Sequence, residues 1–372
     1  MSSPIAADPT PADAPKDTIL SIQVMRGIAA VAVAIYHTHL ILAQPQYGGI
    51  EIFGTLAAPG WLGVNFFFVL SGFIILHAHS KDIGRPERLP LYLWKRFTRV
   101  YPIYWVLLTV FIAAAMLGLG NSQFERSFLN LLSSYLLVEL TPSFSLPLQV
   151  AWTLVCEIRF YALFALLILN RRLGLIAFGL WIAGIAAANI WSDPQPLGIF
   201  HVWNVYFLCG MATYALYQFV PARFGLPLLA AGLFGLFSCV ATGLVAERIA
   251  ETGRGELLAL ALPFSLILLG GALAQRHKRW RPARILLLIG EASYSIYLVH
   301  SAAITLAAIL ARKFLAGALP APLLFVAIAI FSVIVGGLVH MLIERPVLRA
   351  MRWKSSRHSP SGSRLHTAAA EQ

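Results

Sequence analysis

The stretch "SIQVMRGIAAVAVAIYHTHL" (residues 21–40) has the composition of a membrane-spanning helix, yet it contains Arg26 and His37. About 20 apolar residues in a helix cross the hydrocarbon core of a bilayer. An ionisable side chain inside such a helix costs at least about 2.5 kcal/mol, so it indicates a function. Eleven residues place Arg26 and His37 about 16 Å apart and within roughly 20° of the same helix face.

Similar apolar runs recur along the whole chain. Of its 372 residues, 59% are hydrophobic and 12% are charged, and the mean hydropathy is +0.75. A soluble domain is only about half apolar. We therefore expect an all-α, polytopic integral membrane protein with about ten transmembrane helices. The expected spans are 19–43, 61–79, 100–119, 152–170, 173–191, 199–219, 225–245, 256–274, 285–311 and 322–343.

The basic residues lie mainly in alternate connecting segments. If the N-terminus is cytoplasmic, 21 of the 28 Lys and Arg residues face the cytoplasm, five face the other side, and Arg26 and Arg159 lie within spans. The positive-inside rule then predicts that both termini are cytoplasmic. The net charge of +12 comes from these segments rather than from one basic face, so we expect no binding to nucleic acid.

We expect one transmembrane domain over 18–345. Residues 1–17 are expected to form a disordered cytoplasmic tail, and 346–372 a basic, largely disordered cytoplasmic tail. The first apolar run lacks a small-residue cleavage site, so we interpret it as a retained helix. Residues 128–140 are too short to cross alone, and we interpret them as an interfacial or re-entrant helix on the outer side. The cysteines lie within apolar runs and indicate neither a disulfide nor a metal site.

Polar residues of different spans are expected at two depths. Arg96 and Arg99 of "KRFTRVYP" lie with Arg26 near the cytoplasmic side. Such a group suits a phosphate-bearing ligand, because guanidinium groups bind phosphate in bidentate fashion. The outer level is expected to contain His37, Glu157, Tyr161, Asn65 and His300. A histidine with a carboxylate suits proton abstraction from a hydroxyl, and the distance between the levels is about the reach of an extended pantetheine arm.

Structural roles are the alternative for several of these residues. A histidine within a membrane often only hydrogen-bonds a neighbouring helix, and we interpret His39, His201 and His340 in this way. Glu157 could form a structural ion pair with Arg159. The arginines of "KRFTRVYP" could be topology anchors.

Five segments in this order resemble the membrane-bound acyltransferase 3 family, in particular its branch that acts on bacterial exopolysaccharides. They are "IQVMRGIAAVAVAIYH", "GVNFFFVLSGFII", "KRFTRVYPIYW", "WTLVCEIRFY", and "GEASYSIYLVH" followed by "IERPVLR". The chain differs from many members by having Asn65 in place of Asp, and Ala151 before the tryptophan motif.

The resemblance implies a multi-pass protein of the bacterial inner membrane that transfers an acyl group, usually acetyl, from acyl-CoA to a carbohydrate hydroxyl. The acceptor would be an exopolysaccharide or its lipid-linked precursor, handled among membrane lipids. It also implies that His37 is the essential catalytic residue, that Arg26, Arg96 and Arg99 are required, and that Glu157 belongs to an accompanying motif.

Our hypothesis is that His37 deprotonates the sugar hydroxyl while Glu157 orients or charge-balances it, and that acyl-CoA, most commonly acetyl-CoA, binds at the arginines. Supporting or substrate-binding roles are expected for Asn65, Trp152, Tyr161 and His300. An acyl-histidine intermediate remains an open variant. The alternatives are a proton-coupled transporter, with Arg26, His37, Glu157 and His300 as a relay, and a non-catalytic component of a polysaccharide export complex.

Overall fold

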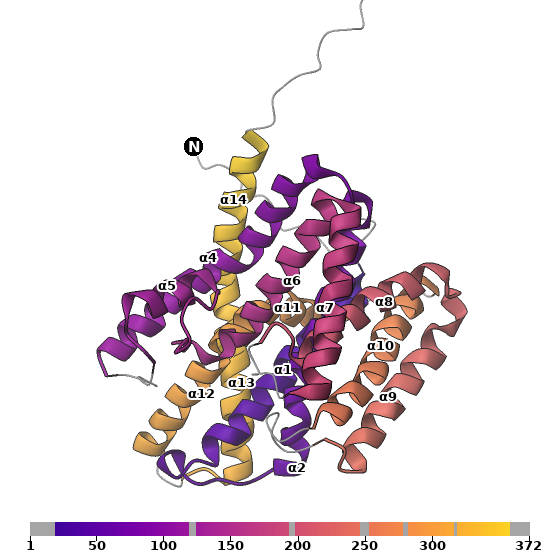
Figure 1. Ribbon diagram of the computed structural model, residues 1–372. Helices are drawn as coiled ribbons and strands as arrows, with labels where there is room; N and C mark the ends of the chain where they lie inside the picture. Colours follow the sequence, from indigo (N-terminus) through magenta and orange to yellow (C-terminus); the bar gives the residue numbers. More distant parts are fainter. Residues whose placement is uncertain are drawn as a thin grey trace, which may run out of the picture.

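The computed structural model describes residues 19–118, 124–192, 198–245, 253–277, 282–315 and 318–357. Within these ranges the regular elements are helices, and strands are absent (Figure 1). The helices are α1 (Leu20–Leu42), α2 (Gly54–Ala57), α3 (Leu62–His79), α4 (Leu89–Met116), α5 (Phe128–Leu136), α6 (Trp152–Leu169), α7 (Arg171–Trp191), α8 (Val205–Phe219), α9 (Gly225–Ala241), α10 (Arg254–His277), α11 (Arg284–Glu291), α12 (Ser293–Phe314), α13 (Ala321–Val339) and α14 (Arg345–Arg357). The expected N-terminal tail, 1–17, and residues 358–372 lie outside the described residues.

The all-α polytopic fold is confirmed. In the described part of the chain, nine helical segments are long and apolar enough to cross a membrane. The one expected span that is not among these nine is 199–219. It corresponds to α8, which has only 15 residues and follows a short 3-10 turn at Val202–Asn204. The α8 helix packs closely on α3, because an added Cβ at Gly72 or Gly210 would lie 2.0 Å from a carbonyl oxygen of the other helix.

The expected span 285–311 is instead two helices, α11 and α12, which meet at Ala292. The α11 helix crosses α1 with almost direct backbone contact. A Cβ on Gly290 would lie 2.2 Å from the carbonyl oxygen of Gln23, and a Cβ on Gly27 would lie 2.9 Å from the amide nitrogen of Gly290. These two glycines let α1 approach the start of α12, where Arg26 reaches Ser293.

The α4 helix begins eleven residues before the expected start of its span at residue 100. Arg96 and Arg99 are therefore held on a helix, three residues apart and on the same face. Pro102 lies inside α4 without ending it. The helix presents both guanidinium groups to the interior of the bundle.

The short helix α5 has nine residues and ends beside the middle of α4, where three side chains of α4 cap its last carbonyls. The donors are the hydroxyl of Tyr104 to Ser134, the indole nitrogen of Trp105 to Tyr135, and the hydroxyl of Tyr101 to Leu136, at 2.7–2.9 Å. These bonds supply partners for carbonyls that a helix leaves unpaired at its end.

The segment after α13 forms a π-helical turn, His340–Glu344, which leads directly into α14. Such a turn carries one extra residue, so it rotates the side chains that follow it. Here it turns Glu344 into the protein interior, where the side chain is 1% exposed. The expected C-terminal tail, 346–372, is helical as far as Arg357.

Candidate functional site

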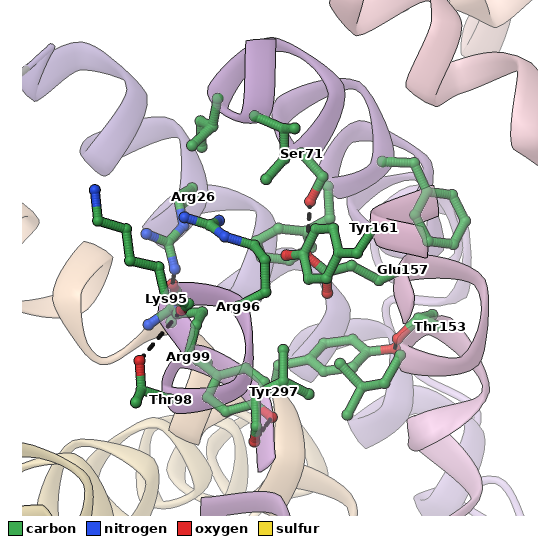
Figure 2. A pocket seen from close by; sticks show the side chains of 18 of the residues that line it. Arg26, Ser71, Lys95, Arg96, Thr98, Arg99, Thr153, Glu157, Tyr161 and Tyr297 are labelled. Carbon is green, nitrogen blue, oxygen red and sulfur yellow. Dashed lines mark hydrogen bonds between the residues drawn. The ribbon is translucent and has the colours of Figure 1, made fainter. Parts of the chain in front are cut away.

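A cavity of about 650 Å³ lies among α1, α3, α4, α6, α12 and α14. Figure 2 shows its charged residues converging from separate helices. Four basic side chains line it, and the acidic side chain of Glu157 lies across the cavity from them. The basic residues are Arg26, Lys95, Arg96 and Arg99. This excess of positive charge suits a polyanionic ligand.

Each arginine is held by a different set of neighbours. Arg26 donates from Nη2 to the hydroxyl of Ser293 at 3.0 Å. Arg99 lies 5.1 Å from the ring centre of Tyr294. Its Nη1 atom is 3.3 Å from an oxygen of Glu344. Arg26 and Arg99 thus line the same cavity, with partners that the sequence did not indicate.

The guanidinium group of Arg96 is held by two aromatic faces. Its Cζ lies 5.6 Å from the ring centre of Tyr161 and 5.9 Å from that of Tyr92. The hydroxyl of Tyr92 in turn donates to the backbone oxygen of Tyr161 at 3.0 Å, which ties α4 to α6. Stacking on aromatic rings orients a guanidinium group without using its hydrogen-bond donors.

Glu157 faces the same cavity as the arginines. Its Oε1 atom accepts hydrogen bonds from the hydroxyl of Ser71, at 3.0 Å, and from that of Tyr161 (Figure 2). This differs from the expected layering, in which Glu157 lay at the level of His37. Glu157 is directed toward Ser71 on α3 and Tyr161 on α6, and not toward His37 on α1.

His37 lies beside His300, outside this cavity. The two imidazole rings are 4.7 Å apart in an edge-on arrangement. The Nδ1 atom of His37 is 2.9 Å from the carbonyl oxygen of Val33. Because a carbonyl can only accept, Nδ1 carries the proton in the neutral ring, and Nε2 keeps a lone pair that can take a proton.

The second histidine of this pair, His300, is fully buried. Its Nδ1 atom lies 2.6 Å from the carbonyl oxygen of Tyr297 and 3.2 Å from that of Ile296. The same donor argument makes its Nε2 the unprotonated nitrogen in the neutral ring. The sequence placed His37 and His300 at one depth, and the structure shows that their rings are also neighbours.

Aromatic side chains separate the cavity from the two histidines. Phe67 and Tyr297 line the cavity, with ring centres 6.0 Å apart, and Tyr297 also lies 5.8 Å from His300. The hydroxyl of Tyr297 donates to the carbonyl oxygen of Val150 at 3.0 Å and accepts from Thr153 at 3.1 Å. The side chain of Tyr297 is therefore fixed at both its ring and its hydroxyl.

Two other expected site residues pack away from the cavity wall. Trp152 lies between the rings of Trp203, at 4.5 Å, and Phe68, at 6.0 Å. Asn65 is fully buried on α3. Tyr161, by contrast, lines the cavity and holds both Arg96 and Glu157.

Sequence reasoning missed Glu344, which is the most connected acidic residue near the site. Its two oxygens contact Arg99, the hydroxyl of Ser295 at 2.7 Å, and Nδ1 of His340 at 2.8 Å. The segment "IERPVLR" contained the signal, but a carboxylate after the last apolar run resembles a surface residue. The described residues contain no group of three His, Cys, Asp or Glu side chains that could hold a metal ion.

Known proteins similar to this chain are acyltransferases or act in polysaccharide production. A family model described as "Acyltransferase domain" matches residues 19–341. The exopolysaccharide production protein ExoZ of Rhizobium meliloti is 30% identical over 79% of this chain and 91% of its own length. The acyltransferase MdmB of Streptomyces mycarofaciens is 26% identical over 89% and 92%. The putative acetyltransferase ORF330 of Acidianus two-tailed virus is 26% identical over 74% and 80%. No solved structure matches the chain significantly.

Proposed function

The chain belongs to the acyltransferase 3 family, and from this premise we propose that it moves an acetyl group from acetyl-CoA to a sugar hydroxyl of an exopolysaccharide or its lipid-linked precursor. The similarity to a protein named for exopolysaccharide production supports a carbohydrate acceptor, and the similarity to a putative acetyltransferase supports an acetyl group. The nine apolar helices among the described residues, together with the family, make it a multi-pass membrane protein, and we propose the bacterial inner membrane as its location.

The donor's phosphate groups bind Arg26, Arg96 and Arg99 in this proposal. The observation that carries it is the convergence of these three guanidinium groups on one cavity, which also contains Lys95. Coenzyme A has a polyanionic end and a reactive thioester end joined by a long arm. Arg26 and His37 lie on one helix, about 16 Å apart along its axis. The extended arm of coenzyme A has about this length, so it could join the cationic cavity to the histidine.

At the reactive end, His37 accepts the proton of the sugar hydroxyl at Nε2. The hydroxyl oxygen attacks the thioester carbonyl, the carbon–sulfur bond breaks, and the coenzyme thiolate takes the proton from His37. His300 supports the ring of His37 from one side. Phe67 and Tyr297 lie between the cavity and the histidines, and Tyr297 is held by two hydrogen bonds, so in this proposal the side chain of Phe67 shifts for the thioester to reach His37.

We assign Glu157 a role on the donor side, in place of the orientation of His37 expected from the sequence. Its oxygen is already engaged by Tyr161 and Ser71. A carboxylate in this position offsets part of the arginines' mutual repulsion while the cavity holds no anion. Trp152 and Asn65 support the site through packing of α6 and α3.

The test is polymer acetylation in a host that lacks its own copy of the gene. His37→Ala should abolish ester formation, while His39→Ala, a matched change on the same helix, should retain it. Insertion of each variant is checked by quantifying the protein in isolated membranes. Unchanged ester content with correctly inserted His37→Ala would exclude His37 as the base, and an absence of acetylation even with the wild-type gene would favour a non-catalytic role.

A further inference from the structure

A second and larger cavity lies on the other side of α1. It has a volume of about 1000 Å³ and is bounded by α1 and α3 on one side and by α9 and α10 on the other. The α9 helix lies at the edge of the molecule, outside α10 (Figure 1). The wall is almost entirely apolar, with small residues such as Ala29, Gly63 and Gly271 on the floor and leucines of α9 at the rim.

The α1 helix separates the two cavities. The residues of α1 that line the second cavity recur at helical spacing: Ser21, Val24, Met25, Ile28, Ala29 and Ala32. At about 100° per residue, this stripe faces roughly away from Arg26 and His37. One face of α1 therefore belongs to the candidate active site, and the opposite face belongs to this second groove.

The polar residues of the groove lie at one end. They are Ser21 at the start of α1, Arg223 before α9, and Gln275 and His277 at the end of α10. The amide nitrogen of Ser21 donates to Gln275 at 2.7 Å, so these two helix ends lie at the same level. The positive-inside rule assigns this end to the cytoplasm. The groove is thus apolar along its length and basic at its cytoplasmic mouth.

The length of the groove matches one leaflet of a bilayer. From Ser21 to Ala32 the lining of α1 extends about 16 Å, at about 1.5 Å per residue. Half of a hydrocarbon core is about 15 Å thick. A fatty acyl chain whose headgroup lies at the cytoplasmic surface would therefore end within the groove.

We propose that this groove is a binding site for an anionic glycerophospholipid of the cytoplasmic leaflet. One of its two acyl chains lies between α1 and α9, and its phosphate is at Arg223. Arg223 is exposed, and its own short turn, Ala222–Phe224, contains no carboxylate. A basic side chain at a membrane surface attracts an anionic headgroup by about 1 kcal/mol. The bound lipid would support α1 from the side opposite Arg26 and His37, independently of which donor or acceptor the enzyme uses.

The test uses the full-length protein purified in a neutral detergent and titrated with phosphatidylglycerol, phosphatidylethanolamine or inorganic phosphate. Binding is read by native mass spectrometry and by the midpoint of thermal unfolding. Phosphatidylglycerol should give a one-to-one adduct and raise the midpoint, phosphatidylethanolamine should bind more weakly, and phosphate alone should do neither. Equal binding of the two phospholipids would overturn the proposal.

Two pairs of variants locate the site. Arg223→Gln should weaken phosphatidylglycerol binding about fivefold, whereas Arg172→Gln, an exposed arginine at the start of α7, should not. Leu233→Trp fills the groove from α9 and should displace the lipid, while Phe234→Trp adds similar bulk outside it. The proposal fails if either pair behaves alike, or if a polyprenyl phosphate displaces phosphatidylglycerol at equal concentration.

Discussion

Arg99 and Glu344 form an ion pair across the wall of the cationic cavity, with 3.3 Å between Nη1 and Oε1. The side chain of Arg99 is 31% exposed, whereas that of Glu344 is 1% exposed. The carboxylate is also held by Ser295 and His340, so its position is fixed by three partners on α4, α12 and the π-helical turn. Glu344 therefore acts as a positioning residue for the guanidinium group of Arg99.

Glu344→Gln should weaken use of the donor without removing the chemistry. The amide keeps the shape of the side chain but loses the charge that holds Arg99. Because solvent reaches about a third of Arg99, we expect a moderate effect, about a tenfold increase in KM for acyl-CoA, with a smaller change in kcat. Steady-state kinetics with membrane preparations measure both. Glu291→Gln, an exposed carboxylate at the end of α11, is the control, and equal KM values in the two variants would contradict the assignment.

Arg96→Lys should reduce donor binding although the charge is retained. Lysine cannot form a bidentate contact with phosphate, and it stacks less well between Tyr92 and Tyr161. The Kd for acyl-CoA, measured by calorimetry on the purified protein, should rise about tenfold. Arg88→Lys, placed just before α4, serves as the matched change. A wild-type Kd for Arg96→Lys would mean that Arg96 is a topology anchor, as the sequence alone also allowed.

The acetylation rate should fall as the pH decreases below the usual range for histidine. His37 accepts a proton only when its imidazole is neutral, so activity is present above its pKa and is lost below it. Initial rates in inverted vesicles between pH 5 and 8 provide the measurement, with acyl-CoA binding followed in parallel. A rate that rises steadily as the pH decreases across this interval would rule out the general-base scheme.

Gly27→Ala should destabilise the protein and lower its activity together. The new Cβ would lie 2.9 Å from the backbone nitrogen of Gly290, so α1 and α11 must separate and Arg26 moves away from Ser293. Overpacking of this kind costs about 1–3 kcal/mol. Gly337→Ala is the control, because an added Cβ there meets nothing within 4 Å. In detergent, Gly27→Ala should have a lower midpoint of thermal unfolding than Gly337→Ala. Identical midpoints would show that α1 and α11 accommodate the added methyl group without a loss of stability.

The sequence was sufficient for the fold class, and it named three arginines that the structure brings to one cavity. Hydrophobic length located the spans, and helical periodicity placed Arg26 and His37 on one face. Depth placed His37 and His300 at one level of the membrane, and the structure shows that their rings are in contact. Depth did not determine the neighbours of Glu157. The face of α6 that turns toward the cavity depends on how α6 packs against α3 and α4.

Two further features could not be predicted from the sequence. The role of Glu344 depends on a single π-helical turn, and a shift of one residue in a helical register leaves no mark in composition. The break between α11 and α12 lies beside the contact of Gly27 with Gly290, which joins residues more than 260 positions apart. Both features arise from tertiary packing and not from local propensity.

The docking of α5 has a consequence for how the protein is made. Most of the other helices are long enough to partition into the bilayer individually, but α5 has nine residues and its final carbonyls depend on Tyr101, Trp105 and Tyr104. These donors precede it in the chain and must already be in place. We therefore expect α5 to fold back onto α4 only after α4 has entered the bilayer.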